Sequence, residues 1–187
     1  MPNRGRRQYP RRKEQTMKNY KYFKPEPETL EDLKAQYRKL AMKHHPDKGG
    51  DTETMKAVNA EYDDFFPKLK DIHKNKDGET YTARQTTTET ADNFKDLINE
   101  LMRMDGITIE VIGCFVWVTG DTKQHREQLK ALRFQWHSKK AAWYLKPEDY
   151  YRKSRREYDL EEIRAMYGTS GQMNSNGSTK LGDILSA

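Results

Sequence analysis

The sequence predicts an α + (α+β) protein, with an N-terminal antiparallel helical hairpin and a C-terminal small α+β domain that has a four-stranded antiparallel sheet. Two apolar stripes at helical spacing flank a short polar turn near residues 45–51, which predicts the hairpin. From residue 90 onward, helical and alternating segments follow in the order α-β-β-α-β-β-α. Between the two parts, residues 68–89 have few apolar side chains, which is typical of a linker.

The composition favours small folded units over one large core. Of the 187 residues, 34% are hydrophobic and 34% are charged, and the formal net charge is +6. This positive balance indicates an acidic partner, either nucleic acid or an acidic protein surface. Cys114 is the only cysteine, which excludes disulfide frameworks and cysteine-rich zinc sites. Because no apolar run approaches the roughly 20 residues of a membrane span, we expect a cytoplasmic protein without membrane contact.

Both ends of the chain are predicted to be disordered. The gathering of Gly, Ser and Asn in residues 169–187 predicts a polar tail. Residues 1–19 predict a basic arm, which is either simply solvated or in contact with phosphates. Its cations stand against the single acid Glu14 and are Arg4, Arg6, Arg7, Arg11, Arg12, Lys13 and Lys18.

The two helices of the predicted hairpin each have a cap and an apolar stripe. Thr29 can cap the first helix, and Pro46 ends it because proline cannot continue the backbone hydrogen bonding. Asp51 or Thr52 can cap the second helix. The stripes are Leu30, Leu33, Tyr37, Leu40 and Ala41 in the first helix, and Met55, Val58, Tyr62, Phe65 and Phe66 in the second. The cations Lys34, Arg38, Lys39 and Lys43 fall away from the first stripe, so we expect them to form a basic outer surface.

The turn "KHHPDKGGD" between these helices admits three interpretations. A metal site is disfavoured because two adjacent histidines cannot easily face one ion and Asp47 is the only carboxylate nearby. A catalytic site is disfavoured because nothing around the turn indicates a substrate pocket. A plain polar loop explains the polarity, but not why His45, Pro46 and Asp47 stand in a row beside a basic helix. We therefore expect no enzyme, no metal and no cofactor.

Residues 20–66 resemble a J-domain, the module that recruits and stimulates DnaK-type heat-shock chaperone ATPases. The resemblance rests on "YKYF", on "LKAQYRKLAMKHHPDKGGD" and on "MKAVNAEYDDFF". His45-Pro46-Asp47 falls at the position of the family's HPD motif. The resemblance places a J-domain at residues 20–67. Two features depart from the family: Glu61 stands where alanine is usual, and the segment before the first long helix is short.

The resemblance implies a mechanism in which the basic helix is drawn to an acidic strip on the chaperone ATPase. Asp47 would pair with an arginine of the ATPase, His45 would add polar contacts, and Pro46 would fix the shape of the loop. The implied chaperone-binding residues are His45, Pro46, Asp47, Tyr37, Arg38, Lys34, Lys39, Lys43 and Lys48. Because the Gly/Phe-rich stretch and the zinc repeats of full DnaJ proteins are absent, a specialised co-chaperone is favoured over a general one.

Residues 90–168 are predicted to form the α+β domain, whose specificity the sequence leaves open between a client protein and nucleic acid. Residues 121–156 contain eleven Lys and Arg residues against four Asp and Glu residues, and tryptophans are interleaved with them. Cations can hold phosphates while an exposed aromatic ring stacks on a base. The candidate binding residues are Lys123, Arg126, Lys130, Arg133, Trp136, Lys139, Lys140 and Trp143.

The same aromatic residues have a structural interpretation, because the buried face of a sheet needs large apolar side chains. We expect Phe115, Trp117 and Phe134 in the core, and a more exposed position for Trp136, Trp143 and Tyr144. The segment "LKALRFQWHSKKAAWYLKP" also weakly resembles a hairpin motif of small bacterial and mobile-element proteins, in which glycine usually stands at the position of Arg133. The alternative to a co-chaperone is thus a nucleic-acid-binding accessory protein linked to replication or to mobile elements.

Overall fold

The structure is a computed structural model that describes residues 19–75, 77–83, 87–147, 150, 157–167 and the backbone of 173–174. The predicted basic arm, apart from residue 19, and the predicted tail, apart from residues 173–174, lie outside these residues. No helix in the described part of the chain is long and apolar enough to cross a membrane.

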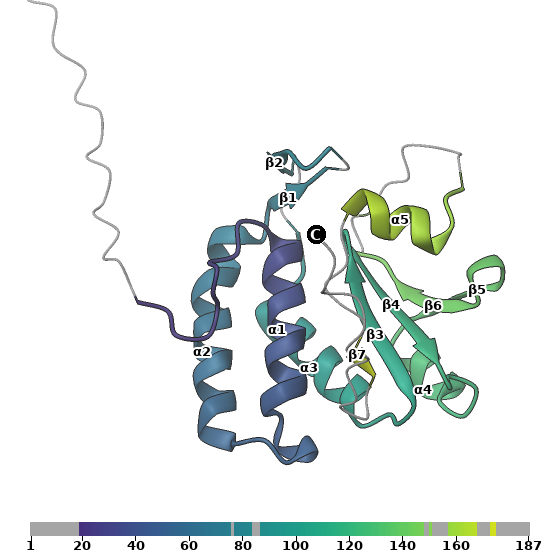
Figure 1. Cartoon of the computed structure of the whole chain (residues 1–187), viewed down its shortest axis with the longest axis horizontal. Helices are drawn as coiled ribbons and strands as arrows, with labels where there is room; N and C mark the ends of the chain where they lie inside the picture. The colour runs from purple at the N-terminus through teal and green to yellow at the C-terminus, as the bar shows by residue number, and fades with distance from the viewer. Residues whose placement is uncertain are drawn as a thin grey trace, which may run out of the picture.

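The N-terminal half is a pair of long antiparallel helices joined by the polar turn (Figure 1). Its elements are α1 (Leu30–His44), the short 3₁₀ helix η1 (Pro46–Lys48), α2 (Thr52–Leu69), and the strands β1 (Ile72–Lys74) and β2 (Thr80–Thr82). Thr29 caps α1 by accepting a hydrogen bond from the Asp32 backbone N–H. Asp51 caps α2 by accepting a hydrogen bond from the Thr54 backbone N–H at 2.8 Å. Of the two predicted caps of this helix, Asp51 is therefore the one that the structure shows.

Glu61 on α2 holds the segment that precedes α1. Its carboxylate accepts hydrogen bonds from the backbone N–H groups of Lys21, Tyr22 and Phe23, at 2.7, 2.9 and 3.2 Å. These bonds hold the segment before α1 against the hairpin, where Phe23 is fully buried. The departure at Glu61 is thus a tether for a segment that is too short to form a full helix.

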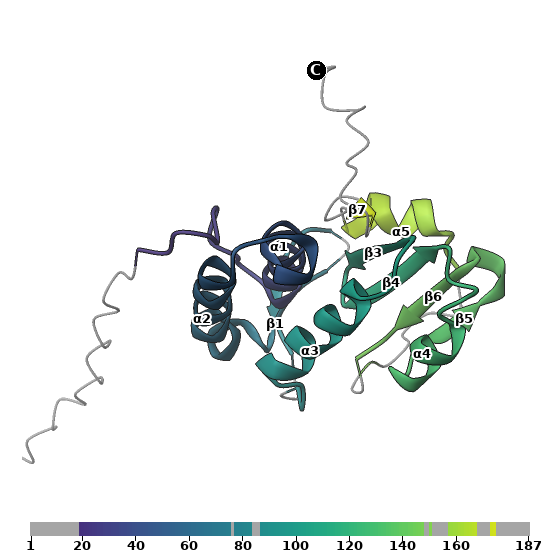
Figure 2. The ribbon, with the colours of Figure 1, turned by 90° about the horizontal axis from the view of Figure 1, so that it is seen from below.

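The C-terminal half is an α+β unit, which confirms the predicted class. Its elements are α3 (Ala91–Met102), β3 (Ile107–Ile112), β4 (Phe115–Gly120), α4 (Arg126–Ala131), β5 (Gln135–His137), η2 (Ser138–Lys140), β6 (Ala142–Leu145), α5 (Leu160–Tyr167) and β7 (Met173–Asn174). The strands pair antiparallel in the order β5-β6-β4-β3-β7. Helices α3 and α4 cover one face of this sheet and α5 covers the other (Figure 2).

The predicted linker is not irregular throughout: it contains the end of α2 and the β1–β2 hairpin, which is tied to α1 where His73 lies 2.6 Å from the carboxylate of Glu31. Residues 173–174 of the predicted disordered tail form β7, which pairs with Thr108 and Ile109 on β3, and the rest of that tail lies outside the described residues. The partners Glu31 and β3 are distant in the sequence, so the local composition carried no signal for these two contacts.

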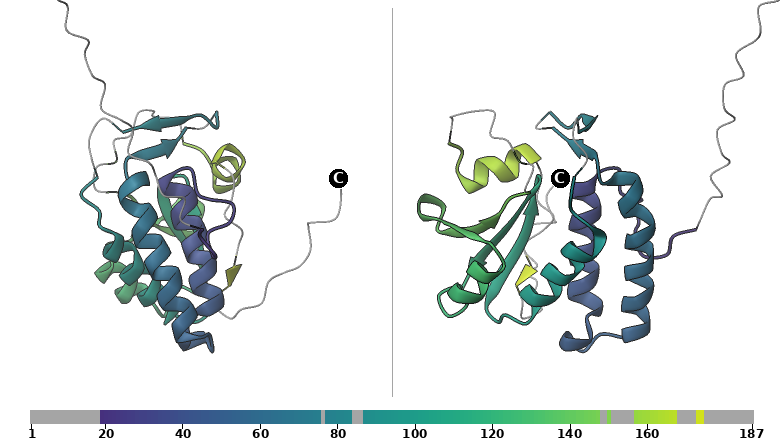
Figure 3. Two further views of the ribbon diagram at one scale, coloured as in Figure 1. Left: turned by 90° about the vertical axis from the view of Figure 1, so that its left-hand side faces the viewer. Right: turned by 180° about the vertical axis from the view of Figure 1, so that it is seen from behind.

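One hydrophobic core runs through both halves of the chain. Phe94 on α3 stacks on Tyr62, with ring centroids 6.1 Å apart, and also lies 6.1 Å from the ring of Tyr37. The side chains of Ile98 and Leu101 continue this contact toward the sheet. A smaller core lies on the other face of the sheet, where Trp117 packs beneath α5. The hairpin therefore packs against α3 and β3 (Figure 3).

The expectation that Lys34 and Arg38 lie on an outer surface is wrong, because this flank of α1 faces α3 and β3. The Lys34 ammonium pairs with Glu89 at 2.6 Å and lies 5.1 Å from the centre of the Phe94 ring. Arg38 is fully buried and donates a hydrogen bond to the backbone carbonyl of Ile109. Burial lowers the pKa of Arg38 to about 10, although the neighbouring Glu110 acts in the opposite direction.

Replacing Arg38 tests how much this contact contributes to the fold. We expect Arg38→Ala to lower the free energy of unfolding by about 2–4 kcal/mol, because it removes a buried hydrogen bond and packed side-chain volume together. The neighbouring substitution Lys39→Ala removes an exposed cation from the same helix and should change stability by less than about 0.5 kcal/mol. Chemical denaturation of both variants measures the difference, and equal stabilities would contradict the assignment.

Candidate functional site

His45 shapes the turn between α1 and α2. Its backbone N–H donates to the carbonyl of Ala41 at 2.8 Å and closes α1. Its ring atom Nδ1 accepts a hydrogen bond from the backbone N–H of Asp47 at 3.2 Å, so the same residue caps the 3₁₀ turn that follows. Pro46 occupies the first position of that turn, where its missing N–H costs nothing.

The two glycines after this turn are required by the backbone. Gly49 has φ +82°, a conformation that residues with a side chain rarely adopt. A Cβ atom at Gly50 would lie 2.2 Å from the backbone carbonyl group of His44, so no side chain fits there. The backbone N–H of Gly50 donates to the carbonyl of His45 at 2.9 Å. The turn therefore has one backbone shape, set by His45, Pro46, Gly49 and Gly50.

The two chemical groups of the motif differ in accessibility. The Asp47 side chain is 49% exposed, whereas that of His45 is only 10% exposed. The Nε2 atom of His45 lies 3.2 Å from Oδ1 of Asn99 on α3. Because Nδ1 accepts the Asp47 N–H, the tautomer consistent with this network carries its proton on Nε2 and donates it to Asn99. His45 thus holds the turn, and Asp47 is the group that a partner can reach.

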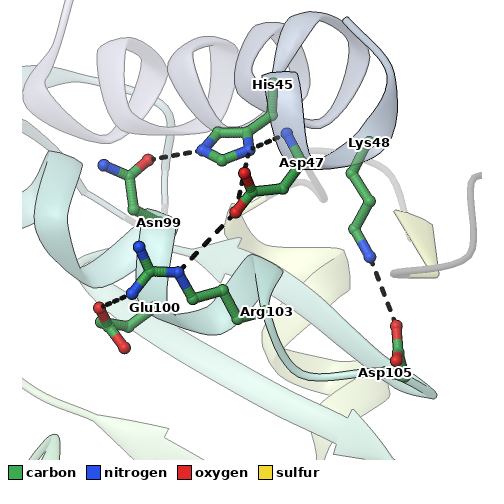
Figure 4. A network of polar contacts seen from close by, with 7 residues as sticks. All are labelled: His45, Asp47, Lys48, Asn99, Glu100, Arg103 and Asp105. Atoms are coloured by element: carbon green, nitrogen blue, oxygen red, sulfur yellow. Dashed lines mark hydrogen bonds and ion pairs between the residues drawn. The ribbon is translucent and has the colours of Figure 1, made fainter.

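Residues from the end of α3 surround the turn on one side (Figure 4). Nε of Arg103 lies 3.8 Å from Oδ2 of Asp47, and the same guanidinium bonds Glu100 at 2.6 Å. Lys48 reaches Asp105, with 3.5 Å between Nζ and Oδ1. The sequence analysis missed Asn99, Arg103 and Asp105 as neighbours of the motif. No local pattern could have indicated them, because they follow the turn by more than fifty residues.

The implied chaperone-binding residues divide into exposed and buried groups. Pro46, Asp47, Lys39, Lys43 and Lys48 are exposed, so the turn still has cations beside it. Tyr37 is fully buried and donates to Asn59 at 2.9 Å; burial and the charges of Asp63 and Asp96 raise the pKa of its hydroxyl. Lys34, Arg38, Tyr37 and His45 are therefore structural in this conformation, contrary to the expected contact surface.

A second candidate site lies where β4, α4 and the β5–β6 hairpin meet. A pocket of about 680 Å³ is lined by Lys123, Arg126 and Lys130 from and before α4 and by Trp136 and Trp143 from the β5–β6 hairpin. Trp136 is 49% exposed, and its ring centroid lies 5.5 Å from that of Trp143. Trp143 is buried, so its expected exposure is wrong, although its side chain still forms part of the wall.

The other predicted binding residues do not line this pocket. Lys139 pairs with Glu157 at 2.5 Å, and Lys140 donates to the backbone carbonyl of Tyr158. Arg133 has φ +65° just after α4, which explains why glycine suits this position in the motif that the segment resembles.

Phe134 and Trp117 are buried as expected, and Phe115 is half-buried. Among the described residues, no cluster of three or more His, Cys, Asp or Glu side chains could hold a metal.

Comparison with known proteins gives short matches to two kinds of protein. The chain is 51% identical over 37 residues to the small t antigen of budgerigar fledgling disease virus, which covers 20% of this chain and 26% of that protein. It is 40% identical over 60 residues to "Chaperone protein dnaJ A6" of Oryza sativa subsp. japonica, covering 29% of this chain and 14% of the relative. A "DnaJ protein homolog 2" of Allium porrum matches with 57% identity over 35 residues, 19% of this chain and 8% of the relative.

These matches cover only a small part of each relative, at most about a quarter of its length. No family model matches the chain, and no solved structure matches it significantly. The DnaJ proteins and the viral T antigens have the J-domain in common. Together with the helical hairpin and its HPD turn, the matches show that this chain carries a J-domain segment.

Proposed function

We propose that the chain is a specialised J-domain co-chaperone that recruits a DnaK-type heat-shock chaperone and stimulates its ATPase through the HPD turn. The observation that supports this most is a turn of fixed backbone shape that presents the Asp47 carboxylate beside the exposed cations Lys39, Lys43 and Lys48. The α+β unit would select what is delivered to the chaperone. A co-chaperone shares the compartment of its partner, so we keep the cytoplasmic expectation as part of the proposal.

The proposed mechanism assigns separate tasks to charge and to shape. The exposed lysines of α1 and η1 attract an acidic surface of the ATPase and orient the encounter, which depends on salt. Asp47 then pairs with a partner arginine, and a pair formed away from water contributes more than an exposed one. His45 and Pro46 contribute by holding the carboxylate in place before binding, which lowers the entropy lost on docking. The chain supplies no catalytic group, because hydrolysis takes place in the partner.

Substitution of Asp47 tests this mechanism. We expect Asp47→Asn to reduce stimulation of a DnaK-type ATPase by about 30-fold or more, because one member of a charge pair is removed while the fold is kept. Glu53→Gln is the matched control, since it removes one exposed carboxylate from the start of α2. Steady-state ATP hydrolysis at several concentrations of this protein gives the measurement. Stimulation by Asp47→Asn equal to that by the wild-type protein would overturn the proposal.

A second function is supported by the pocket beside α4: we propose that it binds single-stranded nucleic acid. Arg126 and Lys130 lie one turn apart on α4, and Lys123 precedes them, so three cations line the pocket. The half-exposed ring of Trp136 offers a face on which a base can stack. Asp121 at the rim and Glu127, which pairs with Lys130 at 3.0 Å, reduce this positive charge without cancelling it.

Binding of a labelled oligonucleotide at several salt concentrations tests the second function. We expect Trp136→Ala to weaken binding about 5- to 100-fold through loss of stacking. We expect Lys123→Gln to reduce the dependence of affinity on salt by about one phosphate contact. Lys139→Gln is the matched control, because it removes an equal charge from a lysine that lies outside the pocket. An affinity that is independent of salt would exclude phosphate contact.

A further inference from the structure

The helix that precedes the HPD turn is covered on two sides. One side packs on α2 through Leu33, Tyr37 and Ala41, as in any helical hairpin. The other side carries Lys34, Arg38 and His45, which lie four and seven residues apart and therefore share one flank of the helix. On that flank Lys34 contacts Glu89, Arg38 contacts β3 and His45 contacts α3. Part of the surface through which the proposed co-chaperone would act is thus occupied by its own chain.

The contacts between α3 and the hairpin are strong in the middle of α3 and weak at its end. Toward the middle of α3, Phe94, Ile98 and Leu101 are buried in the shared core, and their separation from the hairpin would expose a large apolar area. At the end of α3 the contacts are polar: 3.2 Å from His45 to Asn99, 3.8 Å from Asp47 to Arg103 and 3.5 Å from Lys48 to Asp105. The first is one hydrogen bond to a buried ring, and the other two are ion pairs at long distance, which are weak and are screened by salt.

Arg103 has a specific place in this arrangement. Its guanidinium is the cation nearest to the carboxylate that, in the proposed mechanism, receives an arginine from the ATPase. A carboxylate can accept from two guanidinium groups, but an arginine of the ATPase that pairs with Asp47 would meet the like charge of Arg103 beside it, so displacement of Arg103 favours the new pair. Glu100 provides an alternative partner for the displaced Arg103 side chain, because it already bonds the same guanidinium at 2.6 Å. The displacement therefore requires only a change of side-chain position at the end of α3.

We propose that the end of α3 is an autoinhibitory clasp, formed by Asn99, Arg103 and Asp105, that closes over the HPD turn. The clasp places a competing cation beside the accessible Asp47 carboxylate and restrains His45 while the rest of α3 stays packed on the hairpin. This inference rests on the proposed co-chaperone function for its consequence, but the clasp itself is a property of this chain alone. Its opening is local, since the apolar part of α3 does not move.

The first experiment measures the clasp without any partner. Diethyl pyrocarbonate acylates accessible imidazole nitrogens, and mass spectrometry reads the extent of reaction at each histidine of the full chain. In the double variant Asn99→Ala/Arg103→Ala we expect His45 to react about three- to tenfold faster, because two weak polar contacts are removed. His137 on β5 is the internal reference and should react at an unchanged rate. An unchanged rate at His45 would overturn the clasp.

Lys95→Ala is the control for loosening α3 in general. Lys95 lies on the same helix and pairs with Asp63 on α2 at 2.6 Å, away from the turn. Loss of that pair removes a polar contact between α3 and the hairpin but leaves Asn99 and Arg103 in place. We expect the labelling rate of His45 to stay at the wild-type value. An increase equal to that of the double variant would show that α3 separates as a whole, and would also overturn the local clasp.

The second experiment measures the consequence for the partner ATPase. The concentration of this protein that gives half-maximal stimulation should fall about two- to fivefold for Arg103→Ala, as expected for the loss of one exposed competing ion pair. If the wild-type protein stimulates and Arg103→Ala is no better, the autoinhibitory role is wrong and the co-chaperone function stands. If no variant stimulates although His45 labelling rises, the clasp stands as a structural feature and the co-chaperone function fails.

Discussion

A guanidinium buried between the helical hairpin and the first strand of the sheet determines how the two halves of this chain meet. Arg38 leaves α1 on the flank next to the hairpin face and ends on the backbone carbonyl of Ile109. A charged group is buried at such a place only when polar partners replace the water that it loses. The acid Glu110 lies nearby and is bound by Arg164 from α5 through two hydrogen bonds, at 3.1 and 2.5 Å. Elements from both ends of the described chain thus converge on β3.

This junction determines which residues of α1 and of the HPD turn a partner can reach. In an isolated hairpin, the cations of α1 and the imidazole of His45 would all face solvent and a partner. In this chain the second half covers Lys34, Arg38 and His45 and leaves Asp47, Lys39, Lys43 and Lys48 accessible. The backbone of the turn is independent of that cover, because its hydrogen bonds and its two glycines are local. The shape of the motif and the access to it are therefore controlled by different parts of the molecule.

The pocket beside α4 shows how a sheet can serve both packing and binding. Val116, Val118 and Trp143 face the main core, whereas Trp117 faces the smaller core beneath α5. Trp136 pairs directly with Trp143 across β5 and β6, at the edge of the sheet. Since an edge strand has only one neighbour to pack against, the Trp136 ring stays half-exposed beside the cations of α4. Position in the sheet, rather than residue type, separates the structural tryptophans from the one that is available to a ligand.

The sequence by itself determined those features that depend on neighbours along the chain. The apolar stripes of α1 and α2, the cap at Thr29, the choice of Asp51 or Thr52 as the second cap, the HPD turn with its glycines and the α+β class all follow from local spacing and backbone chemistry. The gathering of cations and tryptophans near α4 was also visible as a local concentration of charge. Tertiary structure alone decided the burial of Arg38, the contact of Asn99 with His45, the contact of His73 with Glu31 and the pairing of β7. The physical reason is that these interactions join segments far apart in the chain, and helical periodicity specifies the faces of a helix but not which segment will cover each of them.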